Sequence, residues 1–364
     1  MAQQNNKRKR GAESTPEPEE PPSPIVFLAR GIKADTRLTV FKQEFHLNSS
    51  GLKHHSNYFR KFLDSVGKQP APVSAVFKYD YRSVIDEDGS WALMPAAETE
   101  EVVDEMIALV DRPEKEIEAF RQLLCAMNSK KYAILSADQL RRLTRLADYY
   151  CALPTVSATL TGALLNSPIF YDLGGLGGLG CECHEECVLL LLLARKLRHA
   201  VLFKESLIHT VSRWDKLPLS ETEVIRRDKE LHTLVRLKLG DLHTSIAKAQ
   251  LALIAPFLNE ENTFDELLGH DNYLSRVDEQ DVIGSVHWFR DLHDHALDSY
   301  CGSMLYSNFT GNRIDLISSI LTNNLSLDCT GADAGEKGSV YRKAFLCTDI
   351  EDDEYPWDLE EIDW

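Results

Sequence analysis

The sequence predicts an α+β protein, with short strands and several helices in its first half and an all-helical region after them. Between residues 38 and 94, apolar residues recur at every second position in short runs, which is the period of half-buried strands. Around and beyond these runs they recur at every third and fourth position, as in amphipathic helices. A glycine- and cysteine-rich segment, residues 172–184, separates the two regions. We expect it to be a hinge, because dense glycine is poorly suited to regular structure.

Composition and charge restrict the class of protein. Of the 364 residues, 43% are hydrophobic and 27% charged, as in a globular protein with a core. The net charge of −17 opposes attraction to duplex nucleic acid and to anionic membranes, so we expect neither as a direct partner unless a local basic patch binds one. The longest apolar run, from Val188 to Ala194, is far shorter than the roughly 20 residues of a membrane span.

The N-terminal segment and the cysteines bear on location. Eight unevenly spaced cysteines are typical of reduced thiols, and no apolar segment follows the basic N-terminal cluster as it would in a secretory signal. We therefore predict a nuclear or cytoplasmic protein. Residues 1–24 are predicted to be a disordered arm rich in charge and proline. Its nuclear-signal candidates are Lys7, Arg8, Lys9 and Arg10, with a solvated basic tail as the alternative.

The first folded region, residues 25–171, begins with two short strands. Leu38 and Val40 alternate with polar residues in the first strand, and Phe45 and Leu47 do so in the second. An aromatic helix follows almost directly, and Ser56 is placed to accept a hydrogen bond from one of its free amides. This region is therefore expected to pass from a strand pair straight into a helix.

The remaining elements of this region are predicted from the period of the apolar residues and from residues that favour turns. In the aromatic helix, Phe59 and Leu63 share one face, and Tyr58 and Phe62 form a pair one turn apart. Residues 76–84 and 90–94 are predicted to form a hairpin that turns at Gly89. Helices are then expected over residues 98–111, 113–127 and 136–150, and again after residue 154.

The second region, residues 185–345, has the helical period throughout. Ser220 and Glu223 predict a capped helix start, Gly240 predicts the end of that helix, and a further helix is expected up to Pro256. Two or three more helices are expected between residues 281 and 325. Residues 346–364 form an acidic aromatic tail without basic residues. This tail either docks on a partner or folds back onto a basic patch of its own protein.

No pattern of catalytic or cofactor-binding residues stands out, so we expect no enzyme activity, no cofactor and no metal. Cys181, Cys183, His184 and Cys187 are dense, but four ligands within seven positions leave little room for a tetrahedral zinc site. A hinge followed by a helix start is the preferred interpretation. The histidines of the segment "HWFRDLHDHALD" lack the spacing of a zinc motif, and the glycines of the hinge lack the lysine of a phosphate-binding loop.

Several segments together resemble a BTB/POZ domain of the fungal type over about residues 30–168. They are the strand pair, "SNYFRKFL", the hairpin closed by "VIDEDGSW", "EAFRQLLCAMNSKKYAIL" and "LRRLTRLADYYCALPTVSATLTGALL". The resemblance implies a cluster of helices flanked by a short β-sheet, with a strand directly after the "FRQLLCAM" helix. The chain departs from the family at Asn48 and Ser49, where histidine and lysine are common, and at Gly51, where valine is usual. Counted without gaps, the family's charged-pocket aspartate corresponds to Asp35.

The resemblance implies protein association as the function. Exposed strand edges and apolar helix faces are commonly covered by another chain, and the partner-interface candidates are Asp35, Phe45, Leu47, Leu52, Tyr58, Phe59 and Phe62. The simplest partner is a second copy in a homodimer, or another BTB/POZ protein, and a cullin is a further candidate. We predict an interaction module that presents its helical region to partners. The alternatives are a substrate adaptor of a cullin-type ubiquitin ligase and a nuclear transcriptional regulator.

Overall fold

The computed structural model describes residues 22–28, 31–65, 76–99, 103–165, 167–170, 186–254, 286–297, 312–328, 330–361 and 364. The fold is α+β, and the chain divides into two compact units. The first unit comprises residues 1–49 and 66–113, and the second comprises residues 50–65 and 114–364. The predicted hinge, residues 172–184, and residues 1–21 of the predicted arm lie outside the described residues, so both stay predictions. Residues 22–24, at the end of the predicted arm, are described, and the carbonyl of Ser23 accepts a hydrogen bond from the Gln43 side chain.

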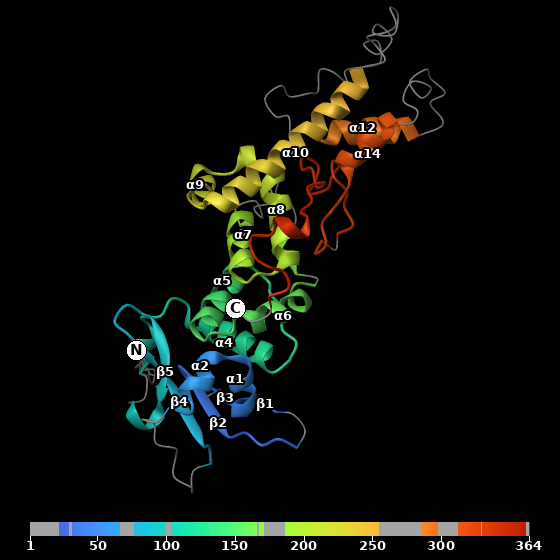
Figure 1. Cartoon of the computed structure of the whole chain (residues 1–364). Helices are drawn as coiled ribbons and strands as arrows, with labels where there is room; N and C mark the ends of the chain where they lie inside the picture. Colours follow the sequence, from blue (N-terminus) through green and yellow to red (C-terminus); the bar gives the residue numbers. More distant parts are fainter. Residues whose placement is uncertain are drawn as a thin grey trace, which may run out of the picture. The chain divides into compact units, whose positions relative to one another are not determined.

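The first unit contains a five-stranded sheet in the order β1-β3-β2-β4-β5 (Figure 1). Its strands are β1 (Ile25–Phe27), β2 (Thr36–Val40), β3 (Gln43–Leu47), β4 (Tyr79–Ile85) and β5 (Trp91–Pro95). Strands β2 and β3 pair antiparallel, as do β4 and β5, whereas β1 pairs with β3 and β2 with β4 in parallel. Both predicted hairpins are confirmed, and alternate residues of β2 and β4 are buried as their two-residue period requires.

The turn between β4 and β5 requires glycine. Gly89 has φ +79°, and a Cβ atom there would lie 2.4 Å from the carbonyl oxygen of Leu109. The helix expected over residues 98–111 is described only as η1 (Ala96–Glu98) and the short α3 (Asp104–Ile107). The prediction of one long helix is wrong at Thr99 and Val103, because both have extended backbones there. Residues 100–102 lie outside the described part.

The second unit begins with α1 (Ser49–His55) and α2 (Asn57–Phe62), and continues with α4 (Pro113–Met127), α5 (Ala137–Tyr149) and α6 (Leu153–Leu164). Ser56 caps α2 as predicted, since its side chain accepts from the amide of Phe59. Ser136 caps α5 in the same way. Residues 128–135 form a turn and irregular chain instead of the strand that the resemblance implies. Ile134 donates its amide to the carbonyl of Ala163, at the end of α6.

The helices beyond residue 186 belong to the same unit. They are α7 (Cys187–Lys196), α8 (Ala200–Ser212), α9 (Leu219–Arg227), α10 (Lys229–Ile254), α12 (Val286–Leu297) and α14 (Asn312–Leu321), with 3-10 turns η2 (Pro168–Phe170), η4 (Trp214–Lys216) and η7 (Asp352–Glu354). Helices α7 and α8 pack side by side, α14 packs against α10, and α12 packs against α14 (Figure 1). The predicted helical region is confirmed in these segments, whereas its last part, the described residues 322–328 and 330–345, forms turns and irregular chain.

The predicted cap and end of the helix around residue 230 are wrong. Helix α9 begins after Pro218, with no side-chain cap, and ends at Asp228. The Asp228 carboxylate then accepts from the amide of Leu231 and so starts α10. Helix α10 continues through Gly240 without interruption. Packing on both sides of Gly240 outweighs the weak helix propensity of this glycine, since Leu239 and Leu242 are both buried.

Candidate functional site

Four of the seven predicted interface residues belong to the core of this chain. Phe45, Leu47, Leu52 and Phe59 are each 0% exposed. Their side chains are therefore buried without a second polypeptide, and we correct the expectation that they contact a partner. The sequence pattern identified apolar faces correctly, but a period cannot distinguish a face covered by the same chain from a face covered by another.

Asp35 holds the start of α1. Its two carboxylate oxygens accept from the backbone amide and from the hydroxyl of Ser49, each at 2.6 Å, and one of them also accepts from the hydroxyl of Thr36 at 2.9 Å. A carboxylate with three such donors stabilises the passage from β3 into α1. These contacts assign Asp35 a structural role within the first unit.

Tyr58 and Phe62 remain partly exposed and form an aromatic patch with Tyr149. The Tyr58 and Phe62 rings stack at 4.8 Å with an interplanar angle of 25°, which confirms the predicted pair. The Tyr149 ring, from α5, lies 5.7 Å from that of Tyr58, and its side chain is 49% exposed. We call Tyr58, Phe62 and Tyr149 the aromatic patch.

The aromatic patch rests on a buried ring pair. Phe59 and Tyr150 stack at 5.1 Å with an interplanar angle of 4°, and both are buried. The Ser56 hydroxyl donates to the carbonyl of Tyr150, and the amide of Asn57 donates to that of Cys151. These contacts fix α2 against the end of α5, so the exposed rings have defined positions. Burial raises the pKa of the Tyr150 phenol well above its usual value, so this ring is neutral.

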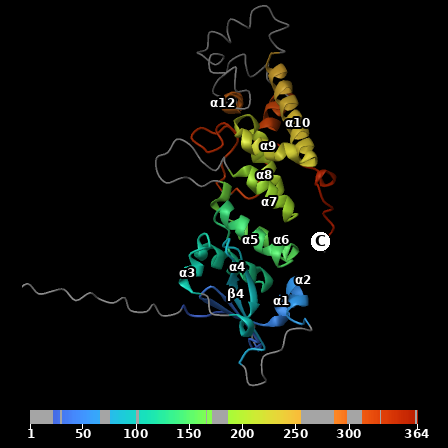
Figure 2. The same ribbon diagram turned by 90° about the vertical axis from the view of Figure 1, so that its left-hand side faces the viewer.

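The acidic aromatic tail folds back onto its own protein, which is one of the two predicted alternatives. Three acidic side chains of the tail pair with cations of the second unit. Asp349 pairs with Lys204 of α8 at 2.6 Å, Glu354 pairs with Lys238 of α10, and Glu361 pairs with Arg198, which precedes α8. The hydrogen bond from Lys204 lowers the pKa of Asp349, so this carboxylate is ionised at neutral pH. Figure 2 shows the C-terminal segment beside α10.

Aromatic contacts accompany these ion pairs. The Phe203 ring of α8, fully buried, lies 5.0 Å from the Trp357 ring and 5.8 Å from the Tyr355 ring. The Arg198 guanidinium lies 4.7 Å from the centre of the Trp364 ring, as in a cation–π contact. Burial raises the pKa of the Tyr355 phenol to about 12. We call Arg198, Phe203, Lys204 and Lys238 the tail groove.

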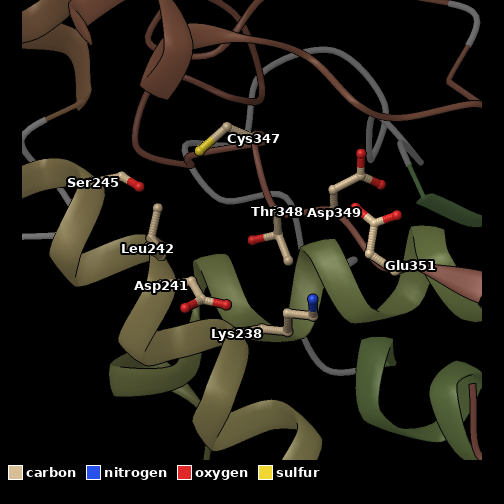
Figure 3. A pocket seen from close by; sticks show the side chains of 8 residues that line it. All are labelled: Lys238, Asp241, Leu242, Ser245, Cys347, Thr348, Asp349 and Glu351. Carbon is tan, nitrogen blue, oxygen red and sulfur yellow. The ribbon is translucent and has the colours of Figure 1, made fainter. Parts of the chain in front are cut away.

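A pocket lies between α10 and the beginning of the tail. Helix α10 contributes Lys238, Asp241, Leu242 and Ser245, and the facing segment contributes Cys347, Thr348, Asp349 and Glu351 (Figure 3). Burial raises the pKa of the Cys347 thiol to about 11, so it is protonated at neutral pH and a weak nucleophile. The lining carries one cation, Lys238, and three carboxylates, those of Asp241, Asp349 and Glu351. The pocket is therefore an extension of the polar interface between the tail and α10.

Cys187 is the first residue of α7 and is buried, and this burial raises the pKa of its thiol. The other three members of the cysteine–histidine cluster lie outside the described residues. Across the described ranges, no three histidine, cysteine or acidic side chains come together as metal ligands. His293 is half-buried, and its Nε2 is hydrogen-bonded to the Ser318 hydroxyl of α14 at 3.0 Å, so this ring contributes to helix packing.

Sequence reasoning missed the residues of the tail groove. Arg198, Lys204 and Lys238 are separated along the chain and form no basic run, so no local signal marks them. The tail itself was recognisable, since its acidic residues alternate with aromatic ones. Only the packing of α8 against α10 brings these cations together opposite the carboxylates of the tail.

No family model, curated protein or solved structure matches the chain. None of the helices in the described part of the chain is both long enough and apolar enough to cross a membrane.

Proposed function

We propose that the protein is an interaction module whose N-terminal region is BTB/POZ-like and associates with a second chain through the aromatic patch. The observation that carries the proposal is a set of three partly exposed rings held on a buried ring pair. Tyrosine and other aromatic residues are enriched in interface cores and among the residues that dominate binding energy. Rigid rings also lose little entropy on association.

The proposed contact is twofold, with the aromatic patch of one copy against that of the next. Such a contact needs only one self-complementary surface. The Phe62 and Tyr149 rings flank Tyr58, so Tyr58 would lie at the centre of the contact, where truncation costs most.

The test is the mass of the full chain in solution. We expect light scattering at micromolar concentration to give a dimer, and the double variant Tyr58→Ala, Tyr149→Ala to give mostly monomer. Leu251→Ala, which removes a 65% exposed side chain of α10, is the matched control and should leave the dimer unchanged. A monomeric wild-type chain, or a dimer that persists in the double variant, would overturn the proposal.

An adaptor of a cullin-type ubiquitin ligase is a second candidate function. An adaptor needs one surface for the cullin and another for the substrate, and the helical region from α7 onwards would hold the substrate. In this case the aromatic patch would contact the cullin. Co-purification of a cullin that is lost in Tyr58→Asp, while the variant unfolds at the wild-type temperature, would favour this candidate. Its absence under every condition would remove it.

A further inference from the structure

The contacts of the tail change in kind at residue 348. Up to this residue, Asn324 holds the backbone of the chain. Its side chain donates to the backbone carbonyls of Cys347 and Thr348 at 3.0 and 3.2 Å, and its backbone N–H donates to the carbonyl of Leu346. In the described part of residues 349–364, backbone hydrogen bonds are made only within the tail, as between Glu354 and Glu351. In residues 349–364, the part of the tail beyond these bonds, the described contacts with the helices are therefore made by side chains alone.

The groove and the tail are complementary in charge. Nine of residues 349–364 are aspartate or glutamate and none is lysine or arginine. The three cations of the tail groove meet carboxylates at residues 349, 354 and 361, so the pairs are distributed along the tail. Most of these side chains keep contact with solvent, and such pairs are weak individually and are screened by salt.

The tail groove also contacts aromatic side chains of the tail. Phe203 provides an apolar surface between the cations, and two rings of the tail cover it. If the tail is released, Phe203 becomes an apolar site flanked by two cations. Lys204 is next to it on α8, and Arg198 lies just before the start of this helix. An acidic peptide with an aromatic residue fits such a site, because cations and an apolar ring select both features together.

We propose that the tail groove is a receptor site for acidic aromatic peptides of partner proteins, and that residues 349–364 occupy it as a reversible intramolecular mimic. A tethered segment has an effective concentration on the order of millimolar. A partner peptide of equal affinity must exceed this concentration to displace the tail. The tail therefore sets a threshold concentration for partner binding. The occupant is a peptide of the tail's own chemistry, acidic and aromatic without basic residues. The proposal goes beyond the proposed function and does not depend on the aromatic patch.

The experiment measures binding of a fluorescein-labelled peptide of residues 349–364 to the full chain by anisotropy. The intact chain should bind it weakly. The variant Tyr355→Ala, Trp357→Ala, whose own tail is loosened, should bind it at least tenfold more tightly. Adding Lys204→Gln and Lys238→Gln to that variant should weaken binding at least fivefold, as should raising the salt from 0.05 to 0.5 M. Lys248→Gln, an exposed lysine of α10, is the matched control and should change nothing.

Several results would overturn the proposal. One is that the loosened variant, Tyr355→Ala, Trp357→Ala, unfolds at the wild-type temperature but does not bind the peptide. Another is that adding Lys204→Gln and Lys238→Gln to this variant leaves its affinity for the peptide unchanged. Concentration-dependent dimers that are lost in Lys204→Gln, Lys238→Gln would instead assign the tail to a second copy. If the loosened variant does not fold, hydrogen exchange of the intact chain decides. Tail amides that exchange as slowly as those of α8 would show a permanent structural element, and fast exchange over residues 349–361 would support a reversible one.

Discussion

The carboxylate of Glu205 accepts a hydrogen bond from the backbone amide of Ser326 at 2.7 Å, and another from that of Leu327 at 3.2 Å. Glu205 lies in the middle of α8 and is 0% exposed. The segment after α14 is thereby fixed to α8 by one buried acidic side chain.

Glu205→Gln should destabilise the protein. A glutamine has one acceptor oxygen, so its amide group would face one of the two backbone N–H groups and leave it unpaired. A buried unpaired donor costs about 1–3 kcal/mol. Urea unfolding at pH 7 would measure the loss, with Glu223→Gln, on the exposed side of α9, as the control. Equal stability of both variants would contradict the structural role of Glu205.

The stability of the protein should fall in acid because of His199. This residue caps α8, since its Nδ1 accepts from the amide of Leu202, and its Nε2 meets the Thr161 hydroxyl at 2.9 Å. Burial lowers its pKa from 6.5 to about 4. The folded state holds the ring neutral, so this contribution is present above pH 6.5 and is lost as the pH falls towards 4. The loss is on the order of 3 kcal/mol.

Unfolding measured between pH 7 and 4 would test this. In His199→Asn the cap is kept by a residue that does not titrate, so the plot of unfolding free energy against pH should be flatter over this range. An unchanged slope in His199→Asn would refute the assignment.

Glu205 has the opposite effect on the pH dependence of stability, because burial raises its pKa from 4.5 to about 6. The stability linked to protonation of Glu205, as distinct from its hydrogen bonds to residues 326 and 327, is complete below pH 4.5 and is lost as the pH rises through 6.

Two glycines should respond in opposite ways to alanine. Gly240 lies inside α10, where an added Cβ meets no atom within 4 Å, so Gly240→Ala should stabilise the protein by about 0.5–1 kcal/mol. Gly89→Ala should destabilise it by more than that, because φ is positive there and the Cβ would collide with Leu109. Thermal unfolding of the two variants in parallel checks both signs.

Breaking the buried ion pair between α4 and α5 should be costly. Glu116 is 3% exposed and accepts from Arg142 at 2.6 Å, and Arg142 is 5% exposed. Glu116→Ala removes this carboxylate, but Arg142 keeps its pair with Asp138 at 3.2 Å, so the loss should exceed about 1 kcal/mol and stay below the roughly 3–5 kcal/mol of an uncompensated buried charge. Glu118→Ala removes the exposed partner of Arg121 and should cost at most about 1 kcal/mol. Similar losses in the two variants would contradict the difference in burial.

The elements that could be predicted are those whose signal is local. The alternation of β2 and β4, the cap at Ser56 and the ring pair of Tyr58 and Phe62 each depend on residues within one turn or one strand. The expectation at Gly240 failed because the helix there is maintained by packing, which a local rule for helix ends does not include. The strand after α4 failed because it came from the resemblance and not from the residues.

For the candidate surfaces, the sequence by itself determined which side chains are apolar, aromatic or charged, and how they repeat. It therefore identified the aromatic helix and the acidic tail. Only the tertiary structure decided that Phe45 and Phe59 are core while Tyr58 keeps its exposure, and that Lys204 and Lys238 meet the tail. The physical reason is that burial and ion pairing depend on segments far apart in the chain, whereas a period or a cap depends only on neighbours.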